Sequence, residues 1–170
     1  MSPRIVLIGL RASGKTTVGR ALADRLQLPF YDSDERVTAR TGRTPAQWLA
    51  SDGEAAFREV EQAAITELAQ RPDGVLAAGG GAPTVAENRA ALAGWSTVLL
   101  LAPLDVLVDR LAGDSTRPAL TDRSLPDEIA FLGMARQDHY LAMGPVVVAE
   151  TDRPLADVVE EIAEAVSAQR

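Results

Sequence analysis

The sequence predicts an α/β fold in which one parallel β-sheet is covered by helices on both faces. Short apolar segments alternate with longer stretches of helical apolar spacing, an alternation that is typical of βαβ units. These segments lie at 4–8, 29–31, 74–78, 96–102 and 145–149. The run from Leu99 to Ala102 is apolar at every position, as in a strand that is buried on both faces. A chain of 170 residues, 46% of them hydrophobic, suffices for one core, so we expect a single domain over 1–170.

The first predicted strand, 4–8, leads directly into a phosphate-binding motif. Residues 9–16 match the pattern G-x-x-x-x-G-K-[ST], and the helical spacing of 16–26 follows. A strand, this loop and a helix, in that order, are the context that the motif requires. Backbone N–H groups of such a loop and the N-terminus of the following helix bind phosphate groups. We therefore expect a nucleotide-phosphate site at 9–17.

Lys15 is the only lysine, and the other 16 basic residues are arginines. Lysine carries a compact point charge on a flexible stem, whereas the arginine fork is wide and planar. In a phosphate loop, the lysine neutralises the β and γ phosphates and the next hydroxyl ligates Mg²⁺. These are the roles that we expect for Lys15 and Thr16. Since strand 96–102 offers no aspartate as a second metal ligand, that ligand must come from elsewhere.

Asp32 and Asp34 follow the second predicted strand, 29–31. Ligands bind outside the carboxyl ends of the strands in an open α/β sheet, and residues i and i+2 of an extended segment point to the same side. One carboxylate could therefore hold the water shell of the metal while the other meets an acceptor hydroxyl. The alternative is that Asp34 only caps a helix that begins at Glu35.

Two further segments carry groups suited to a small polar ligand. Arg58 and Glu61 are one turn apart in the predicted helix 53–70; either they contribute to a site or they form an ordinary ion pair on a solvated face. Three consecutive glycines at 79–81 follow the predicted strand 74–78. Because they add no side chain to a core and cost backbone entropy, they indicate close approach of the backbone to a ligand. A flexible turn is the alternative.

The last part of the chain is predicted to be mostly helical. Helical spacing at 104–111 and 126–142 flanks the polar stretch 113–123, for which a closing lid is our prediction. The final helix, 155–169, is amphipathic and is expected to cover the sheet. Its apolar stripe consists of Leu155, Val158, Val159, Ile162 and Val166.

Composition excludes several classes of protein. The net charge is 17 − 24 = −7 and there is no basic run, so nucleic acid is not an expected partner. The absence of cysteine excludes disulfides and thiolate metal sites. No run of 18 apolar residues and no signal-peptide pattern are present, so we expect neither a membrane span nor export. Cytoplasmic residence, with its supply of ATP, is the default expectation.

Six motifs in this order resemble those of shikimate kinases. They are G-x-x-x-x-G-K-T-T at 9–17, D-S-D at 32–34, G-E-x-x-F-R-x-x-E at 53–61, G-G-G at 79–81, R-P at 117–118 and R-x-x-x-Y at 136–140. The resemblance implies a P-loop kinase of the nucleoside-monophosphate-kinase-like type, with a five-stranded parallel sheet flanked by helices. It also implies an acceptor-binding segment at about 32–61 and a lid at about 112–124 within one kinase domain.

The implied reaction is transfer of the γ-phosphoryl group of ATP, with Mg²⁺, to the 3-hydroxyl of shikimate. This is a step of aromatic amino acid (chorismate) biosynthesis, and we expect a monomer whose partner is the small molecule shikimate. Another small-metabolite kinase, such as a gluconate kinase, is the alternative. A non-catalytic nucleotide-binding module would leave the acceptor site damaged, whereas its carboxylate and arginine positions are all filled here.

The resemblance implies a role for each motif residue. Asp34 accepts hydrogen bonds from the ring hydroxyls of shikimate, including the attacking one, and Lys15 and Arg117 stabilise charge on the transferring phosphoryl group. Arg58 and Arg136 bind the carboxylate of shikimate through the arginine fork. The implied catalytic residues are Lys15, Asp34 and Arg117. The implied nucleotide-binding residues are Arg11, Ala12, Ser13, Gly14, Lys15, Thr16, Thr17, Arg110, Arg117 and Arg153. The implied substrate-binding residues are Asp34, Phe57, Arg58, Gly79, Gly80, Gly81 and Arg136, and the implied metal ligands are Thr16 and Asp32.

Several of these roles are more specific. Phe57 walls the apolar face of the shikimate ring, and Gly80 and Gly81 offer backbone N–H groups. Arg110 stacks on adenine, and Arg153 begins the loop on the other side of the base. Glu61 is expected to hold Arg58 in place. Without the resemblance, the helical position of Arg136 favours a surface charge.

Three positions depart from the family pattern. Ala12 stands where glycine is often found, which limits the backbone angles of the loop. Leu49 stands where phenylalanine is often found, and we expect it to line the pocket instead. Arg11 is an extra cation in the loop, and we hypothesise that it contacts the acceptor or the lid. The pattern assigns no role to His139, which we expect to be solvated.

Overall fold

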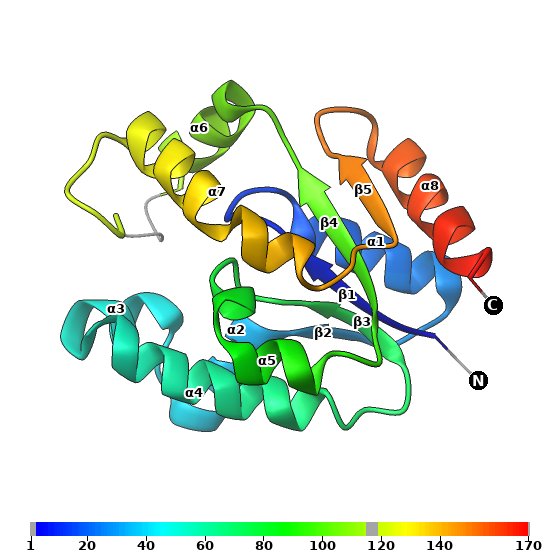
Figure 1. The fold of residues 1–170 in the computed structure, drawn as a ribbon, viewed down its shortest axis with the longest axis horizontal. Helices are drawn as coiled ribbons and strands as arrows, with labels where there is room; N and C mark the ends of the chain where they lie inside the picture. Colours follow the sequence, from blue (N-terminus) through cyan, green and yellow to red (C-terminus); the bar gives the residue numbers. More distant parts are fainter. Residues whose placement is uncertain (1–2, 115–118, 170) are drawn as a thin grey trace.

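The computed structural model describes residues 3–114 and 119–169, and it places one parallel sheet between two layers of helices (Figure 1). The order of the strands is β2-β3-β1-β4-β5, and each pairing is parallel. The strands are β1 (Arg4–Ile8), β2 (Phe30–Asp32), β3 (Gly74–Ala77), β4 (Ser96–Leu101) and β5 (Val147–Glu150). The predicted fold class, an α/β fold with a five-stranded parallel sheet, is confirmed.

Helices follow every strand and cover both faces of the sheet. The helices are α1 (Lys15–Leu26), α2 (Ser33–Thr41), α3 (Pro45–Ser51), α4 (Gly53–Leu68), α5 (Ala86–Ala91), α6 (Leu104–Ala112), α7 (Leu125–Leu141) and α8 (Leu155–Ser167), with a 3₁₀ turn η1 (Ala82–Thr84). Helices α1 and α8 lie side by side on one face (Figure 1), and parts of α4, α5 and α7 pack on the other.

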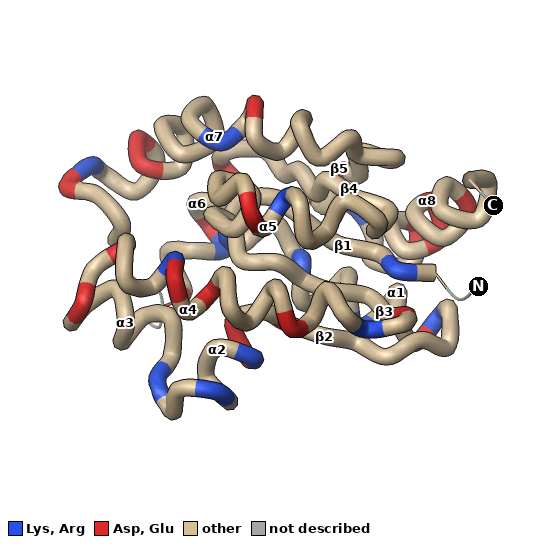
Figure 2. Tube along the Cα trace, turned by 60° about the horizontal axis from the view of Figure 1, so that its bottom comes forward, with Lys and Arg blue, Asp and Glu red and all other residues tan. Residues whose placement is uncertain are grey.

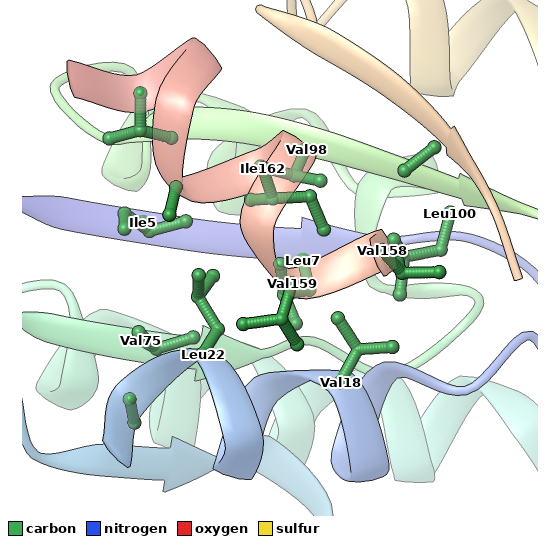
Figure 3. Packing of buried hydrophobic residues seen from close by; sticks show 14 residues of the cluster. Ile5, Leu7, Val18, Leu22, Val75, Val98, Leu100, Val158, Val159 and Ile162 are labelled. Carbon is green, nitrogen blue, oxygen red and sulfur yellow. The ribbon is translucent and has the colours of Figure 1, made fainter. Parts of the chain in front are cut away.

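Alternate residues of β1 enter two separate hydrophobic clusters. Ile5 and Leu7 pack against α1 and α8, as Figure 3 shows, whereas Val6 and Ile8 pack toward α4, α5 and α7. All four are fully buried. The neighbouring strand β4 divides in the same way, with Leu100 in the first cluster and Leu99 in the second. Burial on both faces, as predicted, therefore explains the apolar residues up to Leu100, whereas Leu101 at the end of the strand is 44% exposed.

The short helices α3 and α5 were not predicted, and α2 was considered only as a helix that begins at Glu35, in the alternative for Asp34. A signal for α3 was present in the sequence, since Thr44 and Gln47 form a reciprocal capping box and Pro45 occupies the first turn. The predicted ends of the other elements differ by one or two residues from the observed ones, as is usual for fraying termini. Among the described helices, none combines the length and the apolar character that a membrane span requires.

Candidate active site

A cavity of about 1110 Å³ opens at the carboxyl ends of the strands. The neighbouring strands β1 and β3 are followed by segments that pack on opposite faces of the sheet: α1 on one side, and η1 with α5 on the other. Such a reversal is the place where ligands bind in open α/β sheets. The loops after β1, β2 and β3 therefore line one common cavity.

The phosphate loop after β1 contains three residues with a left-handed backbone. They are Gly9 (φ 144°), Ala12 (φ 63°) and Gly14 (φ 98°). A Cβ atom at Gly9 would collide with the backbone oxygen of Leu100, so this glycine is required by packing as well. Ala12 adopts a conformation that favours glycine, at a cost of roughly 1–2 kcal/mol. The departure from glycine at this position therefore changes the energy of the loop and leaves its left-handed shape in place.

Lys15 begins α1 and its Nζ atom is held within the loop. Nζ donates hydrogen bonds to the carbonyl oxygens of Gly9, at 2.9 Å, and Leu10, at 2.7 Å. The first turn of α1 contains no acidic residue, so the positive end of the helix dipole and the lysine charge act together on an anion. This arrangement suits the phosphate groups of a nucleotide.

Thr16 and Asp32 meet beside the loop and supply oxygen ligands of the kind that Mg²⁺ prefers. The Thr16 hydroxyl donates to Oδ2 of Asp32 at 2.9 Å. Among the described residues, no group of three or more metal-binding side chains is found. A hydroxyl and one carboxylate fit Mg²⁺, which keeps several of its waters and binds few protein groups.

The predicted geometry of the two aspartates was wrong in one respect. Asp32 ends β2 and caps α2, because its Oδ1 accepts hydrogen bonds from the backbone N–H groups of Asp34, at 2.9 Å, and Glu35, at 3.3 Å. The helix begins at Ser33, so the two aspartates do not share an extended segment. The capping that was considered for Asp34 falls to Asp32, and Asp34 lies in the first turn of α2, where it lines the cavity.

Arg58 and Glu61 form a largely buried pair at the cavity rather than a solvated one. Nη1 of Arg58 donates to Oε2 of Glu61 at 2.6 Å, and Nη2 donates to Glu54 at 2.9 Å. The side chain of Glu61 is 1% exposed. Burial raises the pKa of Glu61, and the charge of Arg58 opposes this shift. Figure 2 shows acidic and basic positions interspersed around α2 and α4, the second of which carries this pair. The alternative of an ordinary surface ion pair is therefore wrong.

Arg136 on α7 is 6% exposed, so its interpretation as a surface charge is also wrong. One turn later, the Tyr140 hydroxyl donates to the carbonyl oxygen of Gly80 at 2.6 Å. Burial raises the pKa of Tyr140, which keeps its hydroxyl protonated as a donor. The R-x-x-x-Y spacing thus places one cavity residue and one supporting residue on the same face of α7.

The glycines at 79–81 leave room for charged side chains of the site. A Cβ atom on Gly79 would collide with Glu61, and one on Gly81 would collide with the guanidinium of Arg58. At Gly80 a Cβ atom would lie 3.4 Å from Nη1 of Arg136. The backbone of this segment is therefore closely approached by side chains of the chain itself, Glu61 and two arginines among them. The role in binding a ligand stays a prediction.

Apolar residues form another wall of the cavity. Phe57 is 4% exposed and belongs to a small cluster with Val37 and Ala64. Leu49, which packs on this cluster, also lines the cavity, as expected for the position where an aromatic residue is common. This wall suits the apolar face of a ring.

Arg110 binds the phosphate loop directly. It donates to the carbonyl oxygen of Ala12 at 3.0 Å and to the backbone oxygen of Thr151 at 2.6 Å. The Thr151 hydroxyl in turn donates to Ser13 at 2.8 Å. Both Arg110 and Arg153 line the cavity. Stacking of Arg110 on adenine, and the position of Arg153 on the other side of the base, stay predictions. Its bond to the loop, and the supporting role of Thr151, were not predicted.

The remaining predicted residues differ in their position relative to the cavity. Gly14, Thr17 and the pair Lys15 and Thr16 line the cavity, whereas the Ser13 side chain is buried and is not among the lining residues described. Residues 115–118 of the predicted lid, Arg117 among them, lie outside the described residues. His139 is half-buried, with Nδ1 at 3.4 Å from Arg89, and is absent from the described lining. Arg11 pairs with Glu128 at 2.7 Å.

A phosphate loop at the reversal point of a parallel α/β sheet, facing carboxylates and arginines across one cavity, defines a P-loop kinase of small molecules. The comparisons with known proteins identify the family. The model of the shikimate kinase family matches residues 11–167. The shikimate kinase of Nitratidesulfovibrio vulgaris is 44% identical over 163 residues, covering 94% of this chain and 93% of that protein. The chain belongs to the shikimate kinase family.

Solved structures agree with this assignment. A shikimate kinase from Acinetobacter baumannii in complex with shikimate has a TM-score of 0.93 at 33% identity, covering 100% of this chain and 96% of that one. A gluconokinase from Sinorhizobium meliloti has a TM-score of 0.66 at 22% identity, with 98% and 93% covered, which shows the shared fold alone. The predicted family, its kinase class and its cofactors ATP and Mg²⁺ are confirmed, while the roles of single residues stay predictions.

Proposed function

We propose that this chain transfers the γ-phosphoryl group of ATP to the 3-hydroxyl of shikimate, giving shikimate 3-phosphate and ADP. The bond between the γ phosphorus and the bridging oxygen breaks, a bond to the hydroxyl oxygen forms, and the hydroxyl proton is lost. The observation that carries the proposal is that one cavity is lined by the phosphate loop, by Asp34, and by Arg58 and Arg136.

At the nucleotide end, the phosphate loop binds the phosphate chain of ATP. Lys15 lies at the start of α1 with Nζ inside the loop, where its charge neutralises the β and γ phosphates. Arg117 is assigned the same task on the transferring group from its place in the sequence pattern. Thr16 and Asp32 would hold Mg²⁺, which when bound would neutralise part of the charge on the phosphate groups.

At the acceptor end, the charges suit a carboxylate with several hydroxyl groups. Arg58 and Arg136 offer planar forks that bind a carboxylate through paired hydrogen bonds, and Glu61 keeps Arg58 oriented. Asp34 accepts the hydrogen bond of the attacking hydroxyl, and Phe57 packs on the ring. The shikimate complex of the similar Acinetobacter enzyme supports this choice of acceptor.

The proposal is tested by ADP release from purified protein with MgATP and, separately, shikimate, quinate and gluconate. We expect shikimate to raise the rate far above the background that ATP gives alone. A rate that rises with gluconate and not with shikimate would assign the chain to the alternative kinase class. The Lys15→Met variant serves as the control for a contaminating kinase.

The cavity is lined from the phosphate loop to α7 by residues of one chain, which supports a monomer that acts on a small molecule. Residence in the cytoplasm is part of the proposal. The acceptor segment at about 32–61 and the lid at about 112–124 belong to the same single kinase domain in this proposal. Light scattering on a size-exclusion column with and without shikimate checks the monomer. A mass of two chains at assay concentrations would contradict it.

A further inference from the structure

Glu128, in the first turns of α7, is a buried carboxylate that joins two separate parts of the active site. Its side chain is 1% exposed. Oε1 accepts a hydrogen bond of 2.7 Å from Nη2 of Arg11. Oε2 accepts bonds of 2.8 Å and 2.7 Å from the backbone N–H groups of Leu120 and Thr121, and one of 3.0 Å from the Thr121 hydroxyl. Oε1 thus faces Arg11 of the phosphate loop, and Oε2 faces Leu120 and Thr121 of the segment before α7.

The residues on either side of this carboxylate lie at the cavity. Arg11 and Leu120 both line it, whereas Glu128 is not among the described lining residues and lies behind them. Arg11 lies between Leu10 and Ala12 in the sequence. The carbonyl oxygen of Leu10 accepts a hydrogen bond from Nζ of Lys15. A shift of Arg11 would therefore move the backbone that holds the phosphate-binding lysine.

We propose that Glu128 is a positioning residue for phosphoryl transfer, which fixes the phosphate loop, through Arg11, to the described segment 119–124. This inference rests on the proposed function and names residues that the family motifs of this chain did not single out. Arg11 was expected to contact the acceptor or the lid, and that contact stays a prediction; its partner among the described residues of α7 is the carboxylate of Glu128. Glu128 touches neither substrate in this proposal and acts through Arg11, Leu120 and Thr121.

The chemistry of the surroundings requires a carboxylate at position 128. The groups that face Oε1 and Oε2 from Arg11, Leu120 and Thr121 are donors, and an ionised carboxylate only accepts. In Glu128→Gln, one oxygen becomes an NH₂ group. It must face either Arg11 or the two backbone N–H groups, and turning toward Arg11 breaks fewer hydrogen bonds. We therefore expect Glu128→Gln to lose the link to the phosphate loop specifically.

The experiment is a double-mutant cycle of Arg11→Ala and Glu128→Gln, measured by kcat, by both KM values and by ADP affinity. Because the two residues act as one unit, each single variant should lower kcat about tenfold, and the double variant should lose no more than the worse single one. We expect ADP to bind roughly fivefold more weakly in all three variants. The shikimate KM should change less than twofold.

Two further variants separate positioning from stability. Arg11→Lys retains a charge that can reach the single bonded oxygen, so it should keep at least half of the wild-type kcat. Ile162→Val, on the buried face of α8, removes one methyl group from the core and lowers stability modestly. It should leave kcat unchanged. If Glu128→Gln fails to fold, the comparison of Arg11→Ala with Arg11→Lys still decides the question, because Arg11 is partly exposed.

The inference is overturned if Glu128→Gln keeps both kcat and ADP affinity within twofold of wild type. It is equally overturned if the losses of the two single variants multiply in the double variant, or if Arg11→Lys is as inactive as Arg11→Ala. A wild-type protein that binds ADP without phosphorylating shikimate would refute the proposed function alone. The ADP affinities of the cycle would then test the positioning pair separately.

Discussion

The Tyr140 hydroxyl donates a hydrogen bond of 2.6 Å to the carbonyl oxygen of Gly80. This bond fastens the middle of the glycine segment at 79–81 to α7, the helix that also supplies Arg136. Since Gly79 and Gly81 leave the space in which Glu61 and Arg58 lie, the tyrosine supports the proposed acceptor end of the site, and its hydroxyl also interacts with Arg136.

Removal of this hydroxyl should weaken shikimate binding. In Tyr140→Phe the ring stays in the core while a buried carbonyl loses its donor, which costs about 1 kcal/mol. We expect the shikimate KM to rise several-fold and the ATP KM to stay within twofold, by steady-state kinetics. Tyr31→Phe, at the other tyrosine, is the matched control. Equal effects of the two variants would contradict the support role.

Loss of the lysine charge should stop phosphoryl transfer. Lys15→Met removes the group that donates to the carbonyl oxygens of Gly9 and Leu10, and we expect kcat to fall about 10³-fold. Lys15→Arg retains the charge but places a wide fork where a point charge fits, so it should remain far below wild type. A fully active Lys15→Arg enzyme would show that the choice of lysine has no catalytic meaning. Arg117→Ala, assigned from sequence, should lose about as much as Lys15→Met.

The fork of Arg58 should matter more than its charge. Two of its nitrogens already bind Glu61 and Glu54, and lysine cannot hold those partners and a carboxylate in one plane. We expect Arg58→Lys to raise the shikimate KM about tenfold, with little change in the ATP KM. Arg25→Lys is the control, because Arg25 donates through two nitrogens to Glu160 at an exposed position between α1 and α8. An unaltered shikimate KM in Arg58→Lys would remove Arg58 from the site.

A single methyl group on the glycine segment should displace Arg58. A Cβ atom in Gly81→Ala would occupy the space of its guanidinium group, so we expect the shikimate KM to rise at least as much as in Arg58→Lys. Gly133→Ala is the matched control in α7, where a Cβ atom would make an ordinary contact of 3.5 Å with Leu10 and alanine favours the helix. A Gly81→Ala enzyme with wild-type kinetics would show that the crowding has no consequence for binding.

Stability at low pH should report on the contact between α2 and α4. Hydrogen bonds from Arg40 and Arg36 on α2 lower the pKa of Glu67 on α4. The folded chain therefore keeps Glu67 ionised where the unfolded chain protonates it, so the contribution is present at neutral pH and is lost as the pH falls through the lowered pKa. The Tm of Glu67→Gln should lie below that of wild type at pH 7, and the gap should close below about pH 4.

The matched control for this experiment is Glu59→Gln, at an exposed position of the same helix. We expect it to change the Tm little at either pH. A gap for Glu67→Gln that is as large at pH 3 as at pH 7 would show that packing, and not charge, fixes α2 against α4.

Features that depend on neighbours in the chain were predictable from the sequence. The phosphate loop requires consecutive residues between a strand and a helix, and the position of Lys15 follows from that pattern. The burial of Arg136 depends on segments 50 or more residues away, such as the glycines at 79–81, so helical spacing alone left a surface charge open. The family resemblance supplied what the spacing could not.

Two errors of detail also have a physical cause. Asp32 ends a strand and caps a helix at once, and the extended pattern of the strand alone favoured a shared face for Asp32 and Asp34. Glu128 looked like any acidic residue in the first turn of a helix, because its partners Arg11 and Leu120 are brought to it only by the tertiary fold.

Because Lys15 is the only lysine, an amine-reactive reagent can be used to label the cavity. Lys15 supplies the only ε-amine of the chain, and it lies among the residues that line the cavity. An amine-reactive reagent therefore has a single side-chain target, apart from the α-amino group of the N-terminus. The extent of acylation at position 15, read by mass spectrometry, reports occupancy of the phosphate loop without any enzymatic assay, and each bound nucleotide should appear as protection at one peptide.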